Sequence, residues 1–148
     1  MYNIVVLCRE YPLPGGRMTM IRNLVNHTKH KYTILSWNTC IKRSSLLMYH
    51  LQCFLYLLKR RNDFDIIWGA GLSATSGMIF ARLFNKPGIF NLSGVRTVRH
   101  IPSINAMLER IAAYFADVVT VPSLYCKEAV LKDIKTDKIE VINESSNI

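Results

Sequence analysis

A glycine-rich turn near the N-terminus has the composition of a phosphate-binding loop. Residues 10–16 read EYPLPGG, so Gly15 and Gly16 stand directly before Arg17 and a stretch with the apolar spacing of a helix. Glycines placed there let backbone N–H groups approach a phosphate closely, and the positive end of the helix dipole favours the anion. We therefore predict a phosphate loop formed by Gly15, Gly16 and Arg17. A tight turn without a ligand is the alternative that this segment alone leaves open.

A second group of chemically active side chains lies in the polar stretch 93–102. Arg96, Arg99 and His100 occur there within five positions. Arginine binds phosphate in a forked geometry, so the two arginines suit an acceptor that carries phosphate. His100 is a weak candidate for a catalytic base, because its arginine neighbours disfavour the charged imidazolium. The alternative is ordinary loop charge, with His100 as a surface or acceptor-contacting residue.

Positive charge is concentrated in the first part of the chain. The 148 residues include 19 basic and 10 acidic side chains, and residues 1–61 hold ten of the basic ones against Glu10 alone. Such a one-sided field suits a polyanion, which can be an anionic membrane surface, a phosphate-bearing ligand or a nucleic acid. Nucleic acid is the least expected of the three, since no helix-turn-helix, RRM or zinc-finger pattern is present.

Part of this charge flanks an apolar segment. Residues 46–58 are apolar except at His50 and Gln52, with basic pairs or triplets at 42–43 and 59–61. A helix that is apolar all round is buried on several sides, or meets a membrane or a protein partner, and all three interpretations stay open. The membrane interpretation predicts contact with anionic lipid through its tyrosines and basic residues. These are Lys42, Arg43, Tyr49, Tyr56, Lys59, Arg60 and Arg61.

Strand-like and helix-like segments alternate along the whole chain. Strands are expected at 2–8, 32–37, 64–68, 88–92, 117–121 and 138–142. Helices are expected at 17–29, from Ser44 or Ser45 to about 61, and at 73–85, 104–116 and 123–132. The pattern predicts an α/β fold: a Rossmann-like, doubly wound, mainly parallel six-stranded sheet with helices on both faces. Ligands of such folds bind beyond the carboxyl ends of the strands, which directs attention to loops 9–17, 38–43, 69–73, 93–103 and 122–124.

Several kinds of chemistry are not expected. No GxGxxG or GxxxxGK[ST] pattern occurs, which argues against nicotinamide and P-loop chemistry. The four cysteines are far apart and form no CxxC pair, so no metal site is predicted. The first apolar run stops at Arg9 without a secretory pattern. We therefore expect a reduced, cytoplasmic protein, peripheral at the inner face of the membrane if it contacts lipid.

Five motifs in order make the chain resemble the N-terminal half of GT-B glycosyltransferases of the family-4 type. The first is the Pro-x-Pro-Gly-Gly turn at 12–16. The others are a third strand and loop at 65–71, a Lys-Pro strand with a Ser-Gly loop at 86–94, a Glu-Arg helix leading to Ala-Asp and Ser at 109–123, and a closing strand at 138–142. Each motif is weak alone, and together they cover nearly the whole chain.

This resemblance implies that residues 1–148 form a single acceptor-side domain. A C-terminal donor-binding domain or a partner subunit, absent from these residues, then makes most of the contacts that bind a nucleotide-sugar donor. No other cofactor is expected. Gly15 and Gly16 face the donor diphosphate in this interpretation, while Asp65 and Asp117 are structural. The acceptor, a sugar or a lipid-linked or cell-envelope glycan, meets Trp68, Gly71, Ser93, Gly94, Arg96, Arg99 and His100.

Departures from the family pattern keep other functions open. Trp68, Ala70 and Ser93 occupy positions where the family has histidine, and a serine hydroxyl is not a base near neutral pH. We expect the chain alone to be inactive, and a transferase once it is completed. The alternative is a non-catalytic membrane-docking or scaffold subunit of a split glycosyltransferase. A flavodoxin-like binding domain that needs no partner is a third possibility.

Overall fold

The computed structural model describes residues 1–9, 16–37, 45–92 and 103–142, without the side chains of residues 16–20. Its centre is a six-stranded, entirely parallel sheet in the order β2-β1-β3-β4-β5-β6. The strands are β1 (Asn3–Cys8), β2 (Lys31–Ser36), β3 (Ile66–Ala70), β4 (Gly88–Asn91), β5 (Val118–Val121) and β6 (Ile139–Val141). The predicted Rossmann-like α/β fold is confirmed.

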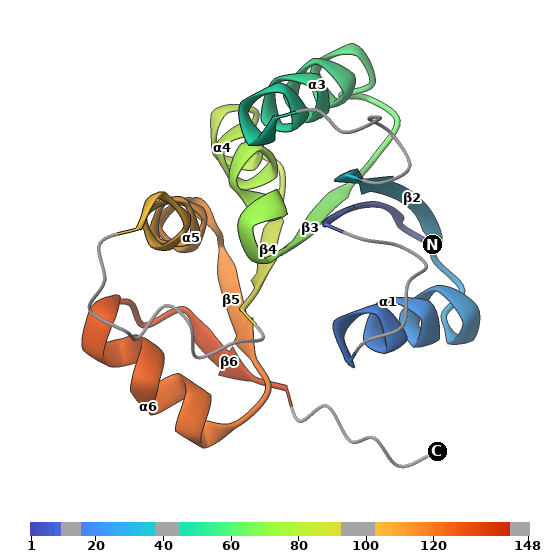
Figure 1. The fold of residues 1–148 in the computed structure, drawn as a ribbon. Helices are drawn as coiled ribbons and strands as arrows, with labels where there is room; N and C mark the ends of the chain where they lie inside the picture. The colour runs from blue at the N-terminus through green and yellow to red at the C-terminus, as the bar shows by residue number, and fades with distance from the viewer. Residues whose placement is uncertain (10–15, 38–44, 93–102, 143–148) are drawn as a thin grey trace.

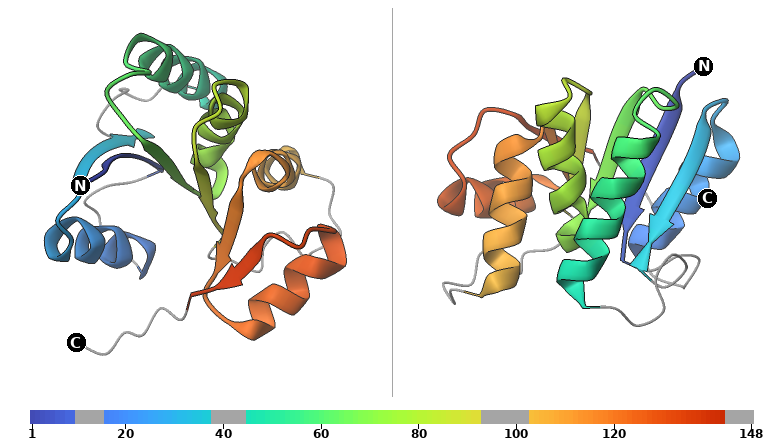
Figure 2. Two further views of the ribbon diagram at one scale, coloured as in Figure 1. Left: turned by 180° about the vertical axis from the view of Figure 1, so that it is seen from behind. Right: turned by 90° about the horizontal axis from the view of Figure 1, so that it is seen from above.

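Helices cover both faces of the sheet, but unequally. The elements are α1 (Gly16–His27), α3 (Leu46–Lys59), a 3₁₀ turn η1 (Gly71–Ala74), α4 (Thr75–Leu83), α5 (Ile104–Phe115) and α6 (Leu124–Asp133). Figure 1 shows α3, α4, α5 and α6 in succession along one face of the twisted sheet and α1 on the other. In the right view of Figure 2, α3, α4 and α5 run side by side, opposite in direction to the strands. Each helix therefore begins near the carboxyl edge of the sheet.

Two hydrophobic clusters follow from the alternation of side chains along the strands. On the face with several helices, Leu7, Ile67 and Phe90 pack against the buried sides of α3, α4 and α5. On the other face, Val6 and Trp68 pack against Ile21 of α1. Successive residues of a strand point to opposite faces, so continuous apolar runs are what a sheet covered on both sides requires.

Serine caps begin three of the helices. The Ser45 hydroxyl accepts a hydrogen bond from the backbone N–H of Met48 at 3.3 Å, and Ser103 and Ser123 cap α5 and α6 in the same way. Each cap satisfies one of the N–H groups that the first turn of a helix leaves without a partner. Ser45 is thus the cap among the two serines considered for α3.

Two aspartates join neighbouring strands where the strands begin. The backbone N–H of Asn3 donates to Asp65 Oδ2 at 2.8 Å, which ties β1 to the start of β3. The N–H of Gly88 donates to Asp117 Oδ2, also at 2.8 Å, which ties β4 to β5. A charged acceptor strengthens such a bond, so both aspartates have the structural role expected from the sequence.

Candidate functional site

The sheet reverses its winding direction between β1 and β3, and this places the candidate site at their carboxyl ends. β1 pairs with β2 on one side and with β3 on the other, so the chain winds one way to β2 and the other way from β3 onward. Loops leave the sheet in opposite directions at such a switch point and open a crevice for a ligand. Cys8 and Ala70 are the last residues of these two strands.

The N-terminus of α1 lies at this edge of the sheet. Helix α1 begins at Gly16 and contains no acidic residue in its first turn. The positive end of its dipole therefore faces the carboxyl edge without a competing carboxylate in the first turn of the helix. Arg17 is the second residue of the helix, and its side chain is among those the structure does not describe. Gly15 lies outside the described residues.

The turn after β3 has a backbone that only glycine adopts easily. Gly71 has a φ of 59°, in the left-handed region, and it turns the chain from β3 into η1. A Cβ on Gly69 would collide with Ala74, so the turn lies directly against the strand. The Thr75 hydroxyl lies 3.1 Å from the carbonyl oxygens of both Leu72 and Leu108, which anchors the turn to α5. A glycine is favoured at this position of the predicted edge because the turn needs a left-handed backbone.

Trp68 lies in the middle of strand β3, two residues before its carboxyl end. Its side chain is 7% exposed and packs with Val6, Cys8 and Ile21 beneath α1. It was predicted to contact an acceptor, and the packing leaves only this small fraction for an acceptor to touch. The other predicted acceptor residues, Ser93, Gly94, Arg96, Arg99 and His100, lie outside the described residues.

A further cation, Arg9, lies at this edge of the sheet. Arg9 is exposed directly after β1, and its guanidinium carbon lies 5.6 Å from the ring centroid of Trp37, which follows β2. Trp37 in turn stacks on Tyr49 at 5.9 Å between centroids. This cation–π contact orients Arg9 at the same edge as the α1 N-terminus, where a second positive group favours an anion. In the sequence, the signal that could have identified Arg9 as a site residue is that it directly follows a buried strand.

A polar cluster lies behind the β3 turn, between α3 and α4. His50 Nδ1 is 3.1 Å from the Ser76 hydroxyl, and burial lowers the pKa of His50. Within the described part of the chain, His50 Nε2 and the Ser73 hydroxyl are buried without a hydrogen-bond partner. The imidazole is therefore neutral near neutral pH.

Tyr49 corrects one prediction of membrane contact. Its side chain is completely buried, and its hydroxyl donates to the Leu35 carbonyl at 3.2 Å. Burial raises the pKa of Tyr49, with Cys53 adding to the effect, so the phenol remains neutral. Tyr49 lies on the side of α3 that faces the sheet, which sequence could not distinguish in a helix apolar all round. Tyr56 is half-buried, and the centroid of its ring lies 5.6 Å from the guanidinium carbon of Arg60.

The basic end of α3 is exposed. Lys59, Arg60 and Arg61 all face solvent, and Arg60 lies 3.8 Å from Asp63. Lys42 and Arg43 are outside the described residues, so membrane contact by the basic ends stays a prediction. No helix within the described ranges is long and apolar enough to cross a bilayer.

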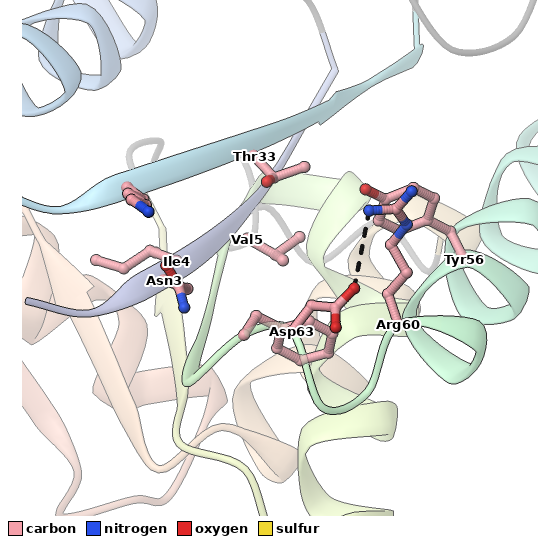
Figure 3. Close-up of a pocket in the computed structure, with 9 residues that line it drawn as sticks. Asn3, Ile4, Val5, Thr33, Tyr56, Arg60 and Asp63 are labelled. Carbon is pink, nitrogen blue, oxygen red and sulfur yellow. Dashed lines mark ion pairs between the residues drawn. The ribbon is translucent and has the colours of Figure 1, made fainter.

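A small hollow lies at the opposite edge of the sheet, where the strands begin (Figure 3). It holds about 130 Å³ and is lined by Asn3, Ile4, Val5, Lys31, Thr33, Tyr56, Arg60, Asp63 and Phe64. Sites for small molecules generally enclose roughly 300 Å³ or more. The hollow is therefore too small for a nucleotide sugar and is far from the switch point. Among the described residues, no group of three His, Cys, Asp or Glu side chains is placed to hold a metal ion.

Comparison with known proteins identifies the fold. No model of a known protein family matches the chain, and no curated protein is similar in sequence. The UDP-GlcNAc 2-epimerase from Neisseria meningitidis, bound to UDP-GlcNAc, superposes with a TM-score of 0.69 at 16% identity over 94% of this chain and 45% of its own. Anabaena Alr3699/HepE, in complex with UDP, gives 0.70 at 12% identity over 97% and 44%. S. aureus MnaA with UDP gives 0.68 at 12% identity over 95% and 43%.

These likenesses show the fold of the chain, a Rossmann-like domain that superposes on one part of those proteins. The chain spans less than half the length of those proteins. At such low identity the superpositions establish architecture and do not distinguish transferases of the family-4 type from epimerases. The family-4 resemblance rests on the sequence motifs alone.

Proposed function

We propose that the chain is the acceptor-side domain of a sugar-nucleotide-dependent glycosyltransferase that acts on a lipid-linked or cell-envelope glycan at a membrane surface. One observation carries this proposal: 94–97% of the chain superposes on less than half of enzymes whose structures contain UDP or a UDP-sugar. The five ordered sequence motifs favour a transferase over an epimerase. A second domain or a partner subunit completes the enzyme.

The carboxyl edge provides the positioning that such a domain needs. In this proposal the N-terminus of α1, which begins at Gly16, faces the donor diphosphate, and Arg9 adds positive charge at the same edge. Helix dipoles and cations placed this way stabilise the charge that develops on a leaving diphosphate. Gly71 gives the turn after β3 its left-handed backbone, and in this proposal the acceptor binds at that turn.

The described residues hold no carboxylate that follows directly on a strand end at this edge; positions 9, 37, 71–73, 92, 122–124 and 142 contain neither Asp nor Glu. A retaining transfer does not require one, because the leaving diphosphate can accept the proton of the acceptor hydroxyl. The chemical role of this domain is then to orient the acceptor and to exclude water. Holding two reactants in the right geometry accounts for a large part of the rate enhancement in such reactions.

Gly16→Asp tests the phosphate assignment. The carboxylate replaces the smallest side chain at the first helical position and repels a diphosphate there, so we expect sugar transfer by the completed enzyme to fall about 100-fold or more. Asn105→Asp is the matched control, because it adds the same charge to the first turn of α5. The measurement is transfer from a labelled nucleotide sugar. Equal transfer by Gly16→Asp and the control refutes the phosphate-loop assignment.

A non-catalytic docking or scaffold subunit is the second candidate function, and the exposed leucines of α3 favour it. In that case a separate subunit carries the whole catalytic site. Pull-down with this chain then recovers transferase activity that neither Gly16→Asp nor Asn105→Asp alters. Activity that depends on Gly16 assigns the catalytic role to this domain instead.

A further inference from the structure

The outward face of α3 is an unbroken strip of apolar side chains. At 100° per residue, Leu47, Met48, Leu51, Leu55 and Leu58 fall within an arc of roughly 100° on the helix, and we call these five residues the leucine strip. Each is between 40% and 79% exposed, whereas Tyr49, Cys53 and Leu57 on the opposite side are buried. The core interpretation of this helix therefore accounts for one side of it and not for the other.

The strip extends along the whole helix. Helix α3 has 14 residues, and its length at the standard rise is about 20 Å. Single exposed leucines are common on soluble proteins, but a contiguous apolar patch marks a surface that binds something. In Figure 2 this helix lies on the outside of the helical layer, at the end next to the β2 edge. Its outer side has access to a large flat partner.

The charges around the strip favour an anionic partner. No acidic residue occurs from Ser45 to Arg61, and the helix ends in three exposed basic residues, Lys59, Arg60 and Arg61. The acid that faces this end is Asp63, 3.8 Å from Arg60 and also exposed, which leaves Lys59 and Arg61 to act on a partner. An apolar arc with basic residues at its margin is the pattern of a helix that lies in the headgroup region of an anionic bilayer.

The same charges argue against a second copy of the chain as the partner. If two α3 helices packed in parallel, their Lys59–Arg61 ends would lie together. If they packed antiparallel, each basic end would lie beside the partner's helix N-terminus, which is itself positive and has no acidic residue in its first turn. Both arrangements bring like charges together, and such contacts oppose association.

We propose that the leucine strip is the membrane-docking surface of this protein and that it binds an anionic lipid bilayer. The five side chains insert at the boundary of headgroups and acyl chains, and Lys59 and Arg61 contact lipid phosphates. Helix α3 then lies along the bilayer. Because its first turn is at the carboxyl edge of the sheet, the candidate site lies on the side of the domain that faces the lipid at this end of the helix. This inference rests on the proposed function for its biological purpose, since a site so placed reaches a lipid-linked acceptor.

Vesicle flotation tests the proposal with variants that spare the core. Leu51→Gln/Leu55→Gln removes two leucines from the centre of the strip and keeps a good helix-forming residue. Leu124→Gln/Leu131→Gln is the matched control on α6, where the two leucines are 69% and 40% exposed. Phosphatidylcholine vesicles with and without about one third phosphatidylglycerol are the probe. We expect the full chain to prefer the anionic vesicles, the strip variant to bind about tenfold more weakly or worse, and the control to bind as the wild type.

Lys59→Gln/Arg61→Gln tests the electrostatic part. It should lower affinity for the anionic vesicles roughly tenfold or more and leave the weak binding to neutral vesicles unchanged. Circular dichroism of every variant checks that the fold is retained. Wild-type chain that binds neither vesicle, or a strip variant that binds as well as the α6 control, overturns the proposal.

Two further results are distinguishable from these. If light scattering shows a dimer that Leu51→Gln/Leu55→Gln converts to a monomer, the strip binds a second copy and the lipid proposal is wrong. If vesicle binding depends on the strip while Gly16→Asp leaves transfer unchanged, docking stands and the phosphate assignment fails. The two proposals can therefore fail separately.

Discussion

The two sides of helix α3 have nearly the same composition and opposite environments. On the inner side, Tyr49, Cys53 and Leu57 are buried against the sheet and α4. On the outer side, Leu47, Leu51 and Leu55 stand at least half exposed. The inner side contributes to folding through burial, and the outer side contributes nothing until a partner covers it. Equal hydrophobicity therefore does not imply equal roles, and mutations on the two sides should separate stability from binding.

Leu57→Ala and Leu55→Ala make the most direct comparison, because the residue type and the helix are the same. Leu57 is fully buried, so its truncation removes apolar contact and leaves a cavity, and we expect a loss of about 2–5 kcal/mol in unfolding free energy. Leu55→Ala should change stability by less than about 0.5 kcal/mol, since alanine favours the helix and little burial is lost. Urea denaturation measures both. Similar losses would show that the outer side is also packed in solution.

Tyr49→Phe asks what the inner side requires besides burial. The hydroxyl donates to the Leu35 carbonyl, and removing it leaves a buried acceptor with one partner fewer. We expect a loss of about 1 kcal/mol near neutral pH. Tyr56→Phe, on the half-buried flank of the same helix, serves as the control and should change little.

The pH dependence of Tyr49→Phe sharpens this prediction. Burial raises the pKa of Tyr49 in the folded state above the value of about 10 in the unfolded chain. The folded state therefore keeps its proton while the unfolded state loses one, and wild-type stability falls as pH rises above about 10, by up to roughly 1.4 kcal/mol per pH unit. Because phenylalanine does not ionise, the advantage of wild type over Tyr49→Phe should shrink there. A constant difference up to pH of about 11 would contradict a buried phenol.

We expect the smallest change in stability from substitution of His50, which lies on the flank of α3 that faces α4. Burial lowers the pKa of His50 in the folded state, so the unfolded chain binds a proton more readily. Stability is then full above about pH 6.5, the ordinary pKa of histidine, and falls as the pH decreases below it. His50→Gln should lose less stability than wild type between neutral and mildly acidic pH in thermal melts. His27→Gln, on exposed parts of α1, provides the comparison.

The order of the secondary structure elements could be predicted because it depends on local patterns. Apolar runs at 2–8 and 64–68 predicted buried strands, and the structure has β1 at Asn3–Cys8 and β3 at Ile66–Ala70, two residues later than expected. Serines 45, 103 and 123 occupy the cap positions of α3, α5 and α6. Asp65 and Asp117 were expected to be structural, and each accepts a backbone N–H from the neighbouring strand. In the site, the positions of Gly16 and Gly71 at the carboxyl edge followed from the same strand boundaries.

Other features of the site depended on which side of an element faces inward. Trp68 belongs to a strand in which both faces are apolar, so sequence did not reveal that its ring packs under α1. Arg9 was only one of ten basic residues until the structure placed it over Trp37. Those relations join segments distant in the chain, and no local periodicity encodes them.

The sequence by itself determined the alternation of strands and helices, because each element depends on neighbours within a few residues, and it determined the excess of positive charge in the first part of the chain. Only the tertiary structure decided that β1 lies between β2 and β3, which creates the switch point. It also decided which side of α3 is buried. A helix that is apolar all round has no polar side to indicate its orientation, so packing against the sheet and α4 selects Tyr49 and Leu57 for the core and leaves Leu51 and Leu55 outside.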